Sequence, residues 1–265
     1  MRKCSVCNHQ FEKFVPLDDT YRRKLIEFGA AFSLADFETL NVEEYQCPKC
    51  GASDRERLYA LFIRKRFPKR GLTDSGQVFR ILDFAPAKPL ADFLREWFQS
   101  GVQPSEYRSA DLLMEGVDDR VDVMDLGVYP DCSWDLILCS HLLEHVPDDR
   151  RAMRELFRIL RPGGSAILMV PICLSATRVD EDPSITGEGE RWRRFGQGDH
   201  VRLYSREGFL KRLREAGFGV EEWKESSFPK RKFEQYGLSR SSVLYVGKRP
   251  RGPVTRLFRS IRKRF

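Results

Sequence analysis

The sequence predicts an α/β fold: a doubly wound, open and mainly parallel sheet with helices on both faces. Two observations lead to this prediction. Short apolar runs typical of buried strands alternate with longer segments whose apolar residues recur at helical spacing. The strand-like runs "WDLILCS" and "SAILMVPI" are almost continuously apolar, as expected for strands covered on both sides. Ligands of such sheets bind at the carboxyl ends of the strands, so we expect functional residues directly after each strand.

The elements can be assigned in order along the chain. A helix is expected over 53–67, where Leu58 and Leu61 fall on one face and Ser53 or Asp54 can cap the first turn. The other predicted helices are 90–98, 148–164 and 205–218, and the segment 18–32 can form a further one. The predicted strands are 78–84, 106–113, 122–126, 134–140, 165–172, 219–225 and 242–248.

The composition indicates a folded protein without a membrane span. The chain has 265 residues, 41% of them hydrophobic, which suffices for one sizeable domain and a small module. No apolar run approaches the ~18 residues that span a bilayer, and the N-terminus lacks the apolar stretch of a secretory signal. We therefore expect a soluble, cytoplasmic protein whose seven cysteines serve in metal binding or burial rather than in disulfides.

The net charge of +7 is concentrated at the C-terminus. Residues 1–53 carry 7 Lys/Arg and 8 Asp/Glu, residues 54–249 carry 33 and 31, and residues 250–265 carry 6 and none. We divide the chain accordingly into an N-terminal module, a central domain and a basic tail. An enzyme of nucleic acids usually carries positive charge on the binding face of its folded domain, so the sequence gives that class little support.

The tail "RPRGPVTRLFRSIRKRF" has an apolar helical stripe among its basic residues. It is either a solvated end of the chain or a reversible contact with an anionic membrane or an acidic partner protein. Nucleic acid is the less favoured partner.

Four cysteines in two C-x2-C pairs predict a zinc site. Cys4 and Cys7 form one knuckle, Cys47 and Cys50 form the other, and two such knuckles can surround one tetrahedral ion. The spacer, residues 8–46, is longer than in most zinc ribbons. The predicted zinc-ribbon module is either a staple for a small core or a surface that recognises a partner or substrate.

Polar residues follow the first four strands of the predicted sheet. Asp83, Asp111 and Asp125 end the first three strands, and Ser140 and His141 follow the fourth. A carboxylate after a second strand suits a ribose diol, because its oxygens accept hydrogen bonds from both hydroxyls.

Six segments resemble the successive motifs of Rossmann-like S-adenosylmethionine-dependent methyltransferases. They are "RILDFAPAKPL", "SADL", "DVMDL", "WDLILCSHLLEHVPDD", "LRPGG" and "ILMVPI", all within residues 75–250. The chain is most similar to a bacterial subgroup with an N-terminal CPxCG zinc knuckle, here "CPKCGASDRERL", and a late segment, here "FGQGDHVRLY". The resemblance implies a seven-stranded sheet, with S-adenosylmethionine and zinc as cofactors.

The resemblance also implies a role for each strand end. The cofactor-binding set would be Asp111 and Leu112 for the ribose, Asp125 and Leu126 for the adenine, and Asp83, Ala85, Ser140 and His141 for the methionine part. One departure concerns the first loop, where Ala85, Ala87 and Pro89 stand in place of glycines. Because alanine disfavours positive φ and proline lacks an N–H, this loop is expected to follow a different path.

The stretch "HLLEH", His141 to His145, fits the H-x-x-E-H pattern of one class of zinc proteases. Those enzymes carry the motif in a long helix, whereas here it follows directly on a strand and ends at Val146-Pro147. The sequence therefore predicts a turn beside the pocket, with His141 facing the pocket and Glu144 and His145 as caps or packing residues.

The segment 174–204 is long and polar, which is typical of a lid or a binding element. It favours a polar small molecule or saccharide as the methyl acceptor, with methylation at oxygen. Histidine suits the role of base, so His141 and His200 are the candidate catalytic residues. Two alternatives remain open: a zinc-ribbon RNA methyltransferase, and a non-catalytic binding protein on the same fold.

Overall fold

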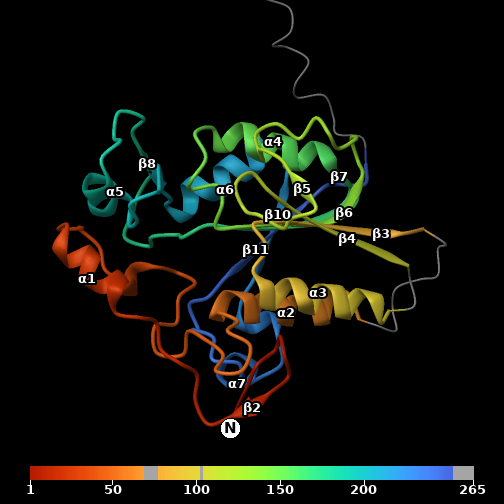
Figure 1. Ribbon diagram of the computed structural model, residues 1–265, viewed down its shortest axis with the longest axis horizontal. Coiled ribbons are helices and arrows are strands. Elements are labelled where there is room, and N and C mark those ends of the chain that lie inside the picture. The colour runs from red at the N-terminus through yellow and green to blue at the C-terminus, as the bar shows by residue number, and fades with distance from the viewer. Residues whose placement is uncertain (69–76, 102–103, 253–265) are drawn as a thin grey trace, which may run out of the picture.

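A seven-stranded sheet forms the centre of the protein, whose computed structural model describes residues 1–68, 77–101 and 104–252 (Figure 1). The strand order is β10-β11-β7-β6-β3-β4-β5, and only β11 runs antiparallel to its neighbours. The strands are β3 (Phe79–Phe84), β4 (Ser105–Asp111), β5 (Asp119–Arg120), β6 (Trp134–Ser140), β7 (Leu160–Met169), β10 (Gly219–Trp223) and β11 (Leu244–Lys248). The predicted mainly parallel sheet of seven strands is therefore confirmed.

The order of the strands reverses between β3 and β6. From β3 the chain adds β4 and β5 on one side, and it then returns to add β6 and β7 on the other. Open α/β sheets bind ligands at such a reversal, outside the carboxyl ends of the strands. The ends of β3 and β6 therefore mark the region in which to look for the site.

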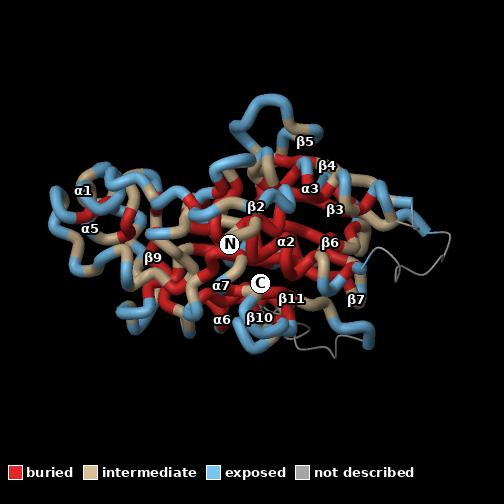
Figure 2. Tube along the Cα trace, turned by 90° about the horizontal axis from the view of Figure 1, so that it is seen from below, coloured by how far each residue is buried: buried red, intermediate tan, exposed pale blue. Residues whose placement is uncertain are grey.

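Helices cover both faces of this sheet. α2 (Asp54–Arg66) and α3 (Lys88–Gln99) lie on one face, and α4 (Asp149–Ile159) and α6 (Arg206–Glu215) lie on the other (Figure 1). Buried positions are concentrated in the central strands and in α2 (Figure 2). α2 is buried on most of its surface because the N-terminal segment packs against the side that faces away from the sheet.

One buried arginine, Arg57, makes several of the contacts that join the N-terminal segment to the rest of the protein. The segment contains β1 (Arg2–Lys3), β2 (Gln10–Phe11), α1 (Thr20–Glu27) and the 3-10 helix Leu34–Asp36. Arg57 of α2 is fully buried and stacks over the Phe14 ring at 3.8 Å. Its guanidinium donates hydrogen bonds to the carbonyl oxygens of Glu44, Tyr45, Ala52, Tyr236 and Gly237. Side chains of the segment therefore share a core with the sheet.

Small elements complete the described chain. β8 (Asp180–Glu181) and β9 (Arg202–Leu203) form a two-stranded sheet beside α5 (Glu188–Phe195). The 3-10 helix Glu225–Ser227 and α7 (Lys232–Gln235) follow β10. Figure 1 shows α1 near α5, so the N-terminal segment meets the segment that was predicted to be a lid.

Three elements differ from the sequence prediction. The third strand is 119–120 and not 122–126, because the Asp122 side chain and carbonyl accept from the N–H groups of Met124 and Asp125 and close a turn. α4 ends at Ile159 and not at 164, since the residue before Pro162 disfavours helical backbone, and β7 begins at Leu160. The segment 174–204, for which the sequence predicts no helix or strand, contains β8, α5 and β9.

In the part of the chain that the structure describes, no helix is both long enough and apolar enough to cross a membrane. The predicted basic tail, 250–265, lies outside the described residues except for its first three.

Candidate active site

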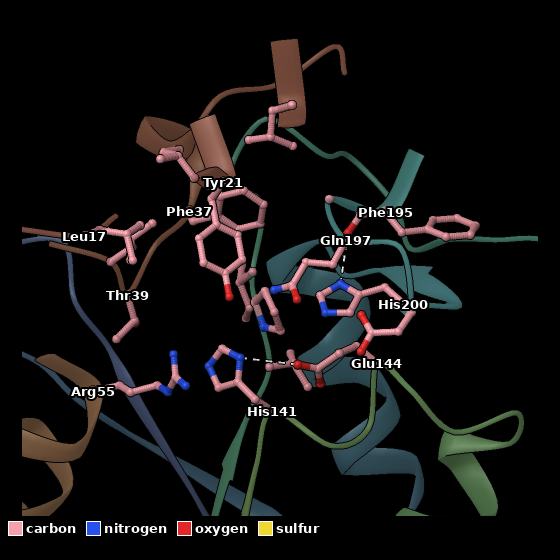
Figure 3. A pocket seen from close by; sticks show the side chains of 18 of the residues that line it. Leu17, Tyr21, Phe37, Thr39, Arg55, His141, Glu144, Phe195, Gln197 and His200 are labelled. Atoms are coloured by element: carbon pink, nitrogen blue, oxygen red, sulfur yellow. Dashed lines mark hydrogen bonds and ion pairs between the residues drawn. The ribbon is translucent and has the colours of Figure 1, made fainter. Parts of the chain in front are cut away.

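A cavity of about 320 Å³ lies at the carboxyl ends of β6 and β7. Its floor comes from the turn after β6 and from Val170 to Ile172 after β7, and one wall comes from residues 195–200. The N-terminal segment forms the roof with apolar side chains that include Leu17, Tyr21 and Phe37 (Figure 3). Elements far apart in the sequence therefore enclose one pocket, with carbon-rich walls above and polar groups below.

His141 projects into this cavity because the backbone turns sharply after β6. Its φ is +54°, in the left-handed region that non-glycine residues rarely adopt, and its N–H donates to the Met169 carbonyl at 2.8 Å. Strained backbone of this kind is concentrated at functional sites. The HLLEH motif thus lies in a turn and not in a helix, which excludes the geometry that the zinc-protease pattern requires.

Glu144 lies beside His141 at the base of the cavity. His141 Nδ1 is 3.3 Å from Glu144 Oε1 (Figure 3), and the carboxylate, 1% exposed, has no hydrogen bond from the described residues. Burial, together with the positive charge of Arg55, lowers the pKa of His141 to about 4. His141 is therefore neutral at pH 7 and able to accept a proton.

His200 comes from the segment that follows α5, and it is also buried. Its Nδ1 is 3.1 Å from the Phe195 carbonyl oxygen, and burial lowers its pKa. Ligand atoms of Glu144, His145 and His200 lie within 4.8 Å of one another, a donor set that suits a divalent cation. The structure thus brings both predicted catalytic histidines into one pocket and adds Glu144, which the sequence prediction treated as a cap or packing residue.

Two side chains of the "DHVRLY" segment, Arg202 and Tyr204, hold the elements around the pocket. Arg202 is buried and donates to the carbonyl oxygens of Leu143, Val146 and Pro147, so it holds the HLLEH turn in place. Tyr204 donates to the Asp149 carboxylate at the start of α4. These side chains do not line the pocket; they hold the HLLEH turn and the start of α4 in place.

The predicted cofactor residues of β3 and β4 lie at the neighbouring strand ends. Asp83 is buried and accepts a hydrogen bond from Tyr107 Oη at 2.7 Å, and burial raises its pKa to about 7. Ala85 has φ +49°, so it adopts the left-handed backbone usual for glycine, and its N–H is bonded to the Ala110 carbonyl. Asp111 Oδ1 accepts from two backbone N–H groups of its own loop, at 2.7 Å each. Its Oδ2 accepts no hydrogen bond from the described residues, so it is available to a ribose hydroxyl.

The remaining predicted cofactor residues differ in exposure. Leu126 is fully buried and its N–H donates to Glu155, whereas Leu112 is 48% exposed. Asp125 Oδ1 is 3.4 Å from the Gly127 N–H. Ser140 Oγ is 2.8 Å from Tyr59 Oη, which links the end of β6 to α2.

The four cysteines of the predicted zinc site come together. The sulfur atoms of Cys4, Cys7, Cys47 and Cys50 lie within 4.8 Å of one another, and the Cys4–Cys50 and Cys7–Cys47 sulfur distances are each 3.8 Å. Four thiolates at such distances fit a tetrahedral zinc ion. The spacer of 39 residues between the two pairs, 8–46, supplies the side chains that form the roof of the cavity. No local sequence pattern predicted this role.

Sheet order, a strand-end cavity and polar residues beside it define an α/β enzyme that binds its ligands at the point of strand reversal. A family model described as "Methyltransferase domain" matches residues 52–222, and the chain belongs to this family. The chain therefore carries a methyltransferase domain.

One relative is the 27-O-demethylrifamycin SV methyltransferase of Amycolatopsis mediterranei (strain S699), 35% identical over 114 residues. The match covers 40% of this chain and 38% of that protein, so the chain spans well under half of the relative's length. The citrinin polyketide synthase CMeT domain is 17% identical with a TM-score of 0.45, over 75% of this chain and 52% of that one. The YcgJ protein from Bacillus is 18% identical with a TM-score of 0.43, over 72% and 97%.

Proposed function

We propose that this methyltransferase acts on a hydroxyl oxygen of a polar small molecule or saccharide that lies in the cavity under the N-terminal segment. The observation that carries the proposal is the His141–Glu144 pair, which faces a cavity sized for a small molecule. The name of the rifamycin relative supports it, because that protein methylates an oxygen of a small molecule. The net charge of −1 on residues 1–53 argues against the RNA alternative, in which this segment would bind a polyanion.

His141 would act as the general base. In the tautomer that carries its proton on Nδ1, the atom 3.3 Å from Glu144 Oε1, Nε2 would accept the hydroxyl proton, and Glu144 would stabilise the imidazolium that forms. Bound S-adenosylmethionine supplies a methyl group already activated by its sulfonium charge. Asp111, through its free Oδ2, would hold the ribose of this cofactor. The apolar roof excludes water and keeps the acceptor oxygen in line.

We also propose that Cys4, Cys7, Cys47 and Cys50 hold one zinc ion. The ion would fix the two ends of the spacer 8–46, so the roof of the cavity depends on it. This zinc is remote from the reacting atoms, and its role is to hold the fold.

The experiment begins with a comparison of small molecules from cells with and without the gene, to identify a compound that gains one methyl group. The purified enzyme is then assayed on that compound. His141→Ala should lower kcat by about 100-fold or more, because general base catalysis is worth that much, with the affinity for S-adenosylhomocysteine little changed.

His9→Ala is the matched control, since His9 is exposed and outside the cavity; it should keep full activity. If RNA accepts the methyl group and no small molecule does, the proposed acceptor class is wrong. If His141→Ala retains normal kcat, the assignment of the base is wrong.

A further inference from the structure

Arg55 is a cation in the cavity whose chain neighbours in α2, Asp54 and Glu56, are acidic but form no ion pair with it among the described residues. It is the second residue of α2, it is half-buried, and it lines the pocket together with Tyr45. In Figure 3 its guanidinium points towards the cavity next to His141. Among the described residues no carboxylate forms an ion pair with it, and its side-chain contact is a 3.5 Å hydrogen bond from Nη1 to Tyr45 Oη.

The open donors of Arg55 are not a general property of this helix. Arg57, two residues later, donates to five carbonyl oxygens and has no capacity left. A guanidinium carries five N–H donors, and burying them without acceptors is costly. The start of a helix adds partial positive charge at the same place. The site therefore attracts an anion with two oxygens, for which a guanidinium has matching geometry.

The position of Arg55 indicates which anion this is. One turn further along α2, Tyr59 contacts Ser140, so Arg55 stands beside the carboxyl end of β6, where the strand order reverses. The opposite side of this crevice, the loop after β3, offers few donors. Pro86 and Pro89 have no N–H, and the Ala85 N–H is bonded to the Ala110 carbonyl. A carboxylate bound there needs its donors from another element.

We propose that Arg55, supported by Tyr45, holds the carboxylate of the methionine part of S-adenosylmethionine. α2 then supplies the cofactor site with hydrogen-bond donors that the loop after β3, with its two prolines, lacks. The assignment depends on the cofactor of this family, and it is independent of the acceptor proposed above.

Two ligands test it by calorimetric titration. S-adenosylhomocysteine carries the carboxylate, and 5′-methylthioadenosine has the same nucleoside and thioether without it. Arg55→Gln should weaken binding of S-adenosylhomocysteine by about tenfold or more, the usual value of a charge-assisted contact, and leave 5′-methylthioadenosine within about twofold. Arg55→Lys, which keeps the charge but loses the planar pair of donors, should fall between.

Arg66→Gln is the matched control, an exposed arginine at the far end of the same helix, and it should change neither affinity. Melting temperatures establish that each variant is folded; if Arg55→Gln is not, Arg55→Lys decides. An equal loss for both ligands would show a general disturbance of the pocket and overturn the proposal. Unchanged binding of S-adenosylhomocysteine would also overturn it and assign Arg55 to the acceptor. Because no acceptor is used, an error in the acceptor class cannot affect the result.

Discussion

Single residues in the cavity derive their chemistry from their surroundings. His141 would titrate near 6.5 in water, yet burial and the charge of Arg55 lower its pKa to about 4. Asp83 shows the opposite effect, since burial raises its pKa to about 7. The lowered pKa keeps His141 unprotonated at neutral pH but also makes it a weaker base, so proton transfer to it depends on the negative charge of Glu144, which stabilises the imidazolium.

This shift predicts a pH dependence. Unfolded His141 gains its proton below about pH 6.5, whereas folded His141 gains it only near pH 4. The neutral side chain therefore contributes to the free energy of unfolding above pH 6.5, and this contribution is lost as the pH falls towards 4. NMR titration of the imidazole signals should place one midpoint near 4. His141→Gln should make the free energy of unfolding decline less between these two pH values. A midpoint for His141 near its ordinary value would contradict the burial that the structure gives it.

The two carboxylate oxygens of Asp111 have different roles, and the substitution Asp111→Asn can distinguish them. Its Oδ1 closes the loop after β4, while Oδ2 is free for a ribose hydroxyl. Asp111→Asn retains an oxygen for the loop but replaces the second acceptor and the charge. We expect the affinity for S-adenosylhomocysteine to fall by about tenfold or more, with an unchanged melting temperature, by titration and calorimetry.

The control for this variant is Asp92→Asn, an exposed carboxylate of α3 whose ion pair with Lys88 is on the surface. It should bind normally. Normal binding by Asp111→Asn itself would place the ribose elsewhere.

Among the elements, the spacer between the two cysteine pairs has the least expected role. It carries α1 and the roof of the cavity, so the zinc site and the acceptor pocket are parts of one arrangement. Arg202, in the segment 174–204, fixes the turn that carries His141 from the other side. Both segments approach the pocket from outside the sheet.

The zinc prediction belongs to this scale. Metal analysis should find one zinc per chain in protein purified without chelator, and Cys47→Ser with Cys50→Ser should lose it. Because the metal clamps the ends of the spacer, loss should lower the melting temperature and methyl transfer more than the affinity for S-adenosylhomocysteine. Cys132→Ser, outside the cluster, should keep its zinc. Protein purified without chelator that contains no zinc would show that the four thiols do not bind it, and a zinc-free variant with an unchanged melting temperature would show that zinc does not hold the roof.

In the whole molecule, one core joins the sheet, α2 and the N-terminal segment, so the described residues show no gap in packing at the predicted boundary between residues 53 and 54. Arg57 illustrates this, since its five carbonyl partners come from both sides of that boundary. The family match begins at residue 52, at the start of α2. The elements before it complete the pocket over a domain that is shared with other methyltransferases.

The sequence by itself determined the sheet, its covering helices, the strand ends that carry Asp83, Asp111 and His141, and the two cysteine pairs. These depend on local patterns: apolar periodicity, caps, and ligand spacing along a few residues. It misplaced the third strand, because the turn at Asp122 depends on side-chain hydrogen bonds that apolar periodicity does not record. Only the tertiary structure decided that residues 17–45 form the roof, that Glu144 faces His141, and that Arg55 bonds to Tyr45 without an ion pair to a described carboxylate. Such contacts join positions separated by tens to hundreds of residues, and they arise from the packing of whole elements, which no short window of sequence encodes.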